Sequence, residues 1–147
     1  IEDWILITLS TKHSAFGNLP PCPYAKKAYL DGNVLIIEVN EYKELNQASD
    51  LLIDNEVIVY VFDPTTITPD ELSGLTIFLN TKYPDLIYLE DHPEDVEEVD
   101  DLILNQGTYA CIFAAERHKI NKAREELKKT NYYDNWTDEY KKEVWSR

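Results

Sequence analysis

Long apolar runs are missing from this sequence of 147 residues. No stretch approaches the roughly 18 to 20 apolar residues that span a bilayer, and no signal-peptide pattern opens the chain. These absences predict a soluble, cytoplasmic protein that is neither inserted in a membrane nor secreted. Because the chain begins at Ile1 rather than at Met, an upstream targeting segment is only weakly excluded.

Cysteine and glycine are also scarce. The two cysteines, Cys22 and Cys111, stand in unrelated contexts and predict no disulfide framework. The sequence has no paired Cys-x-x-Cys, no Walker loop, no Gly-x-Gly-x-x-Gly and no nucleophile elbow. The sequence therefore identifies no cofactor, and the cofactor requirement of the protein stays unknown.

Positive charge is short in the first four fifths of the chain. Residues 1–116 hold five bases and 22 acids, a net charge of −17, whereas residues 117–147 hold nine bases and six acids. Because like charges repel, free nucleic acid and anionic membranes are disfavoured as partners. A basic protein partner or self-association remains open, and so does the plainer view that the charge only keeps the protein in solution.

What is present predicts one α/β domain over residues 1–147. The apolar fraction of 44% is ordinary for a folded chain of this length. Two nearly continuous apolar runs, Val34–Val39 and Val57–Phe62, predict central strands covered on both faces. Ala110–Ala115 has the same character, and the shorter Leu86–Leu89 is expected nearer an edge.

Helical patterns lie between these strands. The sequence Thr68-Pro69-Asp70-Glu71 is a capping box with proline at the first helical position, and it predicts a helix to about Lys82. Glu41–Ile53 carries one apolar stripe. Pro93 is expected to open a helix that ends near Gly107, with the acid-rich residues 90–101 as its solvated face. Further helices are expected around 120–127 and 136–144.

Alternating strands and helices predict an α/β fold with a mostly parallel sheet of about four strands flanked by helices. A ferredoxin-like α+β sandwich is the alternative.

Cys22 is the first candidate for chemistry. If Pro23 were the first helical residue, Cys22 would be the N-cap, where free amides and the helix dipole stabilise a thiolate. Lys26 and Lys27 would strengthen that field. The alternative, a small buried anchor at a tight turn, is the commoner role of such a cysteine.

The triplet Cys22-Pro23-Tyr24 resembles the redox motif of glutaredoxins, with Ala25 at the place of the second cysteine. This resemblance implies a monothiol mechanism on Cys22. Leu19 and the segment 22–25, followed later by His92-Pro93, also resemble an uncharacterised bacterial domain family with a Leu-Cys-Pro-Phe-Ala segment. That resemblance implies no known activity, but it makes His92 a second candidate catalytic residue.

A second candidate site follows from the predicted sheet. Ligands collect beyond the carboxyl ends of parallel strands, and such ends here carry Asp63, Asp91, Arg117 and His118. Their residue types suit acid–base work or metal binding, but no metal-ligand spacing is present and no metal is predicted.

The aromatic residues near the end of the chain are candidates for partner binding. Tyr132, Tyr133 and Trp136 lie beside lysines, and tyrosine and tryptophan dominate interface hot spots. The alternative is that they close a core.

Two function hypotheses remain. The first, which we favour, is an acidic interaction or accessory domain that binds a protein partner or subunit. The second is a small thiol-dependent enzyme or redox protein that uses Cys22 with His92.

Overall fold

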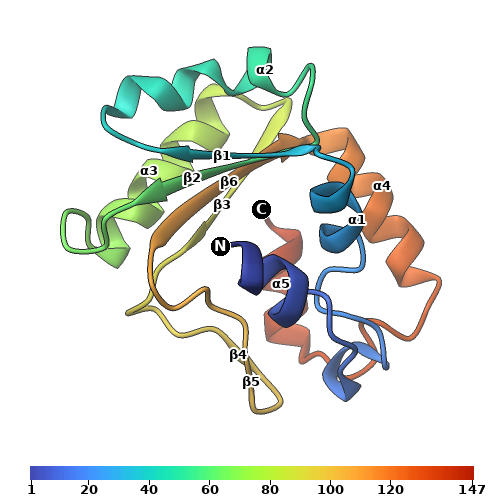
Figure 1. Ribbon diagram of the computed structural model, residues 1–147. Coiled ribbons are helices and arrows are strands. Elements are labelled where there is room, and N and C mark those ends of the chain that lie inside the picture. The colour runs from blue at the N-terminus through green and yellow to red at the C-terminus, as the bar shows by residue number, and fades with distance from the viewer.

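A four-stranded mixed sheet is the centre of the fold (Figure 1). The computed structural model describes residues 1–147. The strands lie in the order β1 (Val34–Glu38), β2 (Val57–Phe62), β6 (Ala110–Glu116) and β3 (Leu86–Asp91). A separate two-stranded hairpin consists of β4 (Glu98–Val99) and β5 (Leu102–Ile103).

Helices surround this sheet. The α-helices are α1 (Ala25–Leu30), α2 (Ala48–Leu51), α3 (Pro69–Lys82), α4 (Arg117–Lys128) and α5 (Asp138–Trp145). A π-helix η1 (Trp4–Thr8) and two 3₁₀-helices, η2 (Ser14–Phe16) and η3 (Tyr42–Gln47), complete the set. None of these helices has the length and apolarity that a membrane crossing requires.

The mixed α/β fold was predicted, but the largely parallel pairing is not found. Strand β1 pairs with β2 in parallel, whereas β6 runs antiparallel to both of its neighbours, β2 and β3. The sheet therefore contains one parallel and two antiparallel pairings. Strands β1, β2 and β3 still point the same way, because β6 opposes both β2 and β3.

The direction of β6 is explained by the connection that precedes it. The helix expected after Pro93 is absent, and the acid-rich segment forms the β4–β5 hairpin instead. Its two-residue turn, Asp100-Asp101, has φ values of 46° and 64°. Aspartate tolerates this left-handed region and favours the tight turn of such hairpins. Because no helix carries the chain back across the sheet, β6 starts near the end of β3 and runs antiparallel to it.

The predicted strand positions are largely correct. Val57–Phe62 and Ala110–Glu116 are buried central strands, and β3 is an edge strand as expected. The prediction for Val34–Val39 is wrong in one respect, since β1 is the opposite edge and none of its residues is fully buried. An apolar run alone does not distinguish an edge strand from a central one.

Two faces of the sheet are covered differently. On one face, η3, α2 and α3 pack on Ile58, Tyr60 and Tyr88 to form the main core. On the other, Val59, Val61 and Cys111 contact Ile1 and Phe113. Figure 1 shows α2 and α3 on one side of the sheet and the N-terminal segment with α4 and α5 on the other.

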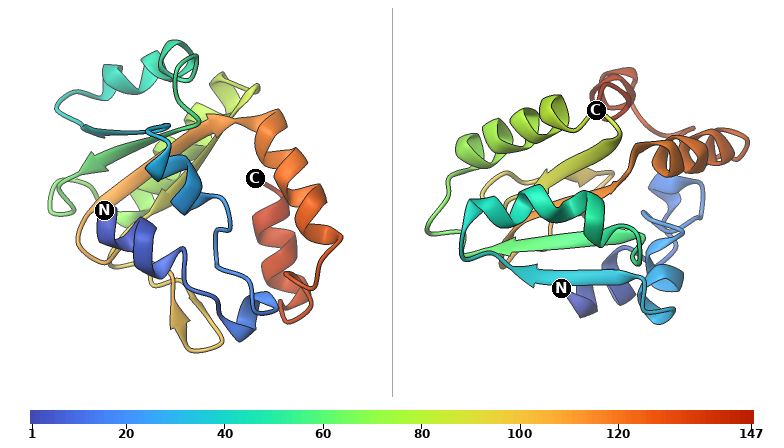
Figure 2. Two further views of the ribbon diagram at one scale, coloured as in Figure 1. Left: turned by 45° about the vertical axis from the view of Figure 1, so that its right-hand side comes forward. Right: turned by 90° about the horizontal axis from the view of Figure 1, so that it is seen from above.

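A second core joins the two ends of the chain. Phe16 packs with Tyr132 and Trp136 at ring-centroid distances of 5.2 and 5.8 Å. Asn135 donates a hydrogen bond of 2.8 Å to the backbone oxygen of Ser14. Figure 2 shows the N-terminal segment beside the C-terminal helices, although they are far apart in the sequence. This second core forms one wall of the cavity described next.

Candidate functional site

A cavity of about 520 Å³ lies between β3, the β4–β5 hairpin, the N-terminal segment and α5. We call it the acidic cavity. Six aromatic side chains line it: Trp4, Phe16, Phe113, Tyr132, Trp136 and Tyr140. Six carboxylates line it as well: Glu90, Asp91, Asp95, Glu97, Glu98 and Glu143. Arg147 is the one positively charged residue in the lining.

The aromatic wall is held by contacts from distant segments. Trp4 stacks on Phe113 at 5.5 Å between ring centroids, and its Nε1 donates a hydrogen bond of 2.7 Å to the backbone oxygen of Leu104. Tyr132 donates from its hydroxyl to the backbone oxygen of Pro21. Trp136 is 91% buried, and its indole Nε1 has no hydrogen-bond partner. A buried donor without a partner is uncommon in folded proteins.

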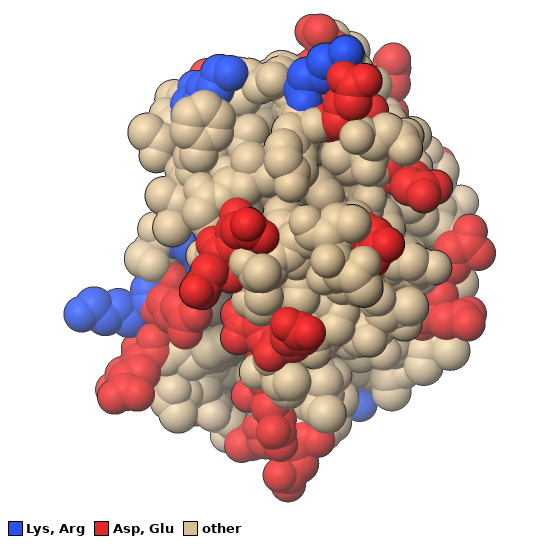
Figure 3. All heavy atoms as spheres, turned by 90° about the vertical axis from the view of Figure 1, so that its left-hand side faces the viewer, with Lys and Arg blue, Asp and Glu red and all other residues tan.

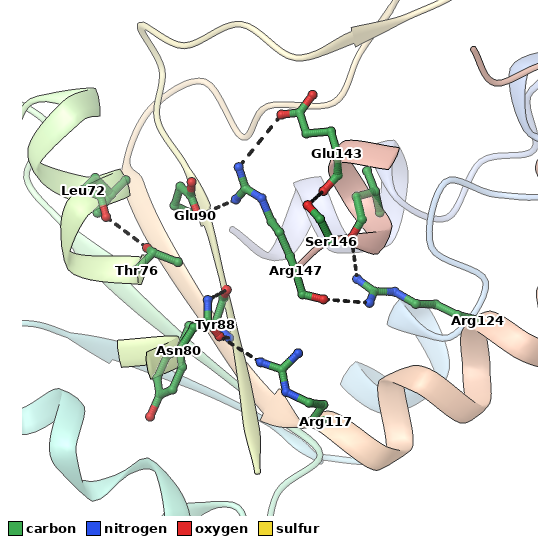
Figure 4. Close-up of polar contacts among 11 residues, drawn as sticks. Leu72, Thr76, Asn80, Tyr88, Glu90, Arg117, Arg124, Glu143, Ser146 and Arg147 are labelled. Atoms are coloured by element: carbon green, nitrogen blue, oxygen red, sulfur yellow. Dashed lines mark hydrogen bonds and ion pairs between the residues drawn. The ribbon is translucent and has the colours of Figure 1, made fainter. Parts of the chain in front are cut away.

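Glu90 and Arg147 form the ion pair of the cavity (Figure 4). Oε2 of Glu90 lies 2.7 Å from Nη1 of Arg147, and the glutamate side chain is only 12% exposed. No hydrogen bond of good geometry reaches this buried oxygen. Nη2 of Arg147 lies 3.9 Å from a carboxylate oxygen of Glu143, which is 66% exposed. Glu90 thus depends on one guanidinium for its charge compensation.

The neighbouring carboxylates are held by the protein itself. Asp91 accepts hydrogen bonds from Asn105 Nδ2 at 2.6 Å and from the backbone amide of Gln106 at 2.8 Å. Burial raises the pKa of Asp91, and these two donors counteract the shift. Glu97 accepts a hydrogen bond from the Tyr140 hydroxyl. Glu90 is a largely buried carboxylate of the cavity whose side chain has Arg147 as its charged partner.

His92 has no nitrogen free for proton transfer. Its Nδ1 accepts from the backbone amide of Glu94 at 3.1 Å, so the proton is on Nε2, which donates to the backbone oxygen of Ile67 at 2.9 Å. The side chain is buried at 2% exposure. These contacts give His92 a structural role, and nothing in them supports the catalytic role that we predicted.

Cys22 does not lie at a helix N-cap. Helix α1 begins at Ala25 with Tyr24 as its N-cap residue, and it has six residues. Burial raises the pKa of the Cys22 thiol, while the backbone amides of Tyr24 and Ala25 lower it by hydrogen bonding. The net direction is upward, which disfavours the thiolate that a nucleophile needs.

The predicted ligand edge does not form, because its residues lie at two opposite ends of the sheet. Glu116, which precedes Arg117 and His118, pairs with Leu86 at the start of β3, whereas Asp91 is at the end of β3. Asp63 accepts two hydrogen bonds from Thr65 in a local turn, and these lower its pKa. The antiparallel direction of β6 thus separates residues that a parallel sheet would have gathered. No group of three or more metal-ligating side chains comes together.

Arg117 and His118 have local partners. Arg117 donates to the backbone oxygens of Pro84 and Leu86, both at 2.9 Å. His118 is exposed, and its Nδ1 lies 3.4 Å from the Glu116 carboxylate. Arg117 also lines a second, polar cavity of about 410 Å³ that shares Glu90 and Arg147 with the acidic cavity. The Glu90–Arg147 pair therefore borders both cavities.

The three aromatic residues predicted to bind a partner are core residues. Tyr132, Tyr133 and Trp136 are exposed by only 5%, 7% and 9% of their surfaces. They pack on Phe16 and on each other, so an exposed aromatic docking surface is not present. The prediction failed because a local aromatic run does not reveal the N-terminal segment that covers it. Two of the three nevertheless form part of the wall of the acidic cavity.

Sequence reasoning missed Glu90, Tyr140 and Arg147 as site residues. Glu90 belongs to the acid-rich residues 90–101, which the sequence analysis interprets as the solvated face of a helix rather than as part of a site. Tyr140 and Arg147 carried no local signal. Only the packing of α5 against β3 and the hairpin brings them to the cavity.

The chain matches no protein-family model, and no curated protein or solved structure matches it.

Proposed function

We propose that this chain is an interaction domain that binds a positively charged segment of a protein partner in the acidic cavity. The observation that carries the proposal is the cavity lining, in which six carboxylates and one guanidinium lie among aromatic walls. A cation that enters such a cavity gains both charge pairing and contact with aromatic faces.

The charge of the whole chain also supports binding of a positively charged partner. Its formal net charge is −14, and the face in Figure 3 carries many more Asp and Glu than Lys and Arg. Such a field steers a basic partner toward the protein and repels polyanions. The thiol-enzyme alternative has less support, because the Cys22 thiol has a raised pKa and both ring nitrogens of His92 are occupied.

A labelled short peptide rich in Lys and Arg tests this function by fluorescence anisotropy. We expect saturable binding that weakens as salt rises, because the contact is electrostatic. Glu90→Gln, which keeps the shape but removes the charge, should weaken binding about tenfold, since a charge-assisted hydrogen bond contributes about 1.5 kcal/mol or more.

The control is Glu139→Gln, which removes the same charge from an exposed residue outside the cavity. It should change the affinity little. Absence of binding to the wild-type protein, or an equal effect of the two substitutions, would show that the acidic cavity is not the binding site.

A further inference from the structure

The acidic cavity already holds a guanidinium, that of Arg147, against the largely buried carboxylate of Glu90. We propose that the cavity recognises an arginine side chain of the partner, which takes the place of Arg147 on Glu90. This inference rests on the proposed function and specifies which cationic group is bound and which residue it displaces.

The geometry favours guanidinium over ammonium. Glu90 on β3 and Glu143 on α5 flank the Arg147 guanidinium from two sides, at 2.7 and 3.9 Å (Figure 4). A planar group with five N–H donors can serve two carboxylates at once, whereas a lysine ammonium acts as a compact point charge. Guanidinium is also less strongly hydrated and stacks on aromatic faces, and the half-buried Trp4 and Tyr140 line the same cavity.

Arg147 can leave the site without unfolding the helix before it. Arg124 on α4 donates to the backbone oxygens of Arg147 and Val144, both at 3.3 Å, and so holds this end of the chain by its backbone. The Arg147 side chain itself is 35% exposed. Its guanidinium is therefore accessible to exchange while its backbone remains fixed.

The second cavity offers a place for the displaced group. It borders the Glu90–Arg147 pair and is lined largely by polar side chains, among them Ser73, Asn80 and Ser146. A guanidinium that rotates away from Glu90 would reach hydroxyl and amide oxygens or water there, so the exchange leaves no charge buried without a partner. The exchange replaces one ion pair by another of the same kind, and its net cost is therefore small.

The test compares three otherwise identical labelled peptides whose central residue is arginine, lysine or neutral citrulline. We expect the arginine peptide to bind roughly fivefold to tenfold more tightly than the lysine peptide, and citrulline to bind least. Arg147→Gln should strengthen binding of the arginine peptide by about threefold or more, because removing an occupant raises the fraction of open sites. Lys142→Gln removes the same charge from an exposed residue outside both cavities and should not have this effect.

The wild-type protein provides a measurement that needs no variant. Titration with N-acetyl-arginine amide should shift the side-chain Nε–H NMR signal of Arg147, and N-acetyl-lysine amide should shift it less. Equal affinity for the arginine and lysine peptides, with Arg147→Gln neutral, would overturn the arginine inference and leave the proposed function standing. Failure of every cationic peptide to bind either protein would overturn the proposed function itself.

Discussion

Gly17 shows how one residue allows the two ends of the chain to meet. It has a φ of +63°, and a Cβ at this position would overlap the backbone and side chain of Asn131. Gly32 has a similar φ of +74° but nothing within 4 Å of the same position. Comparing the two glycines therefore separates backbone strain from steric overlap.

We expect Gly17→Ala to lower the free energy of unfolding more than Gly32→Ala does. The left-handed conformation alone costs an alanine about 1–2 kcal/mol, and only Gly17 adds the clash with Asn131. Urea unfolding followed by tryptophan fluorescence measures both variants. Equal losses would mean that Asn131 shifts easily to make room for the added Cβ. The contact between Gly17 and Asn131 would then not be tightly packed.

Cysteine reactivity is a second test at the residue scale. Burial raises the pKa of Cys22 and raises that of Cys111 to about 12. A raised pKa leaves less thiolate at any given pH, so alkylation of both cysteines in the folded protein should be slower than that of a free thiol. Iodoacetamide labelling across pH, read by mass spectrometry, measures this directly. Rapid labelling of Cys22 below pH 8 would revive the thiol-enzyme hypothesis.

At the scale of elements, the best-specified helix is α3. Glu71 donates its backbone amide to Thr68 Oγ1 at 3.3 Å, and Glu71 Oε2 accepts from the Thr68 amide at 2.8 Å. Thr68→Ala should lower the free energy of unfolding by about 0.5–2 kcal/mol, because one helix-end donor loses its partner. Thr68→Ser keeps the hydroxyl and should be nearly neutral in the same denaturant titration. A neutral alanine variant would indicate that water replaces the cap without loss.

Elements whose signals are local were predicted well, and those that depend on distant partners were not. The capping box predicted the start of α3 (Pro69–Lys82) correctly, because the hydrogen bonds of that box join Thr68 to Glu71, only three residues away. The β4–β5 hairpin was missed because the segment after Pro93 was interpreted as a helix, so the Asp100-Asp101 turn was not recognised. In this segment the turn geometry outweighed the apolar pattern.

For the whole molecule, the net charge of −14 leads to a further prediction. Duplex DNA and anionic liposomes should show no saturable binding at concentrations near 1 µM and physiological salt, because repulsion opposes contact with a polyanion. Gel shift and liposome sedimentation test this, with a basic peptide as the positive control. Salt-sensitive binding of DNA would instead point to the nine bases in residues 117–147.

The sequence by itself determined the mixed α/β character, the positions of the four long strands and α3, and the negative charge. These features follow from local composition and periodicity, which do not depend on what packs against them. Tertiary structure decided the direction of β6, which placed Arg117 and His118 at the opposite end of the sheet from Asp91. It also created the acidic cavity, because the pairing of Glu90 with Arg147 joins residues 57 positions apart through the packing of α5.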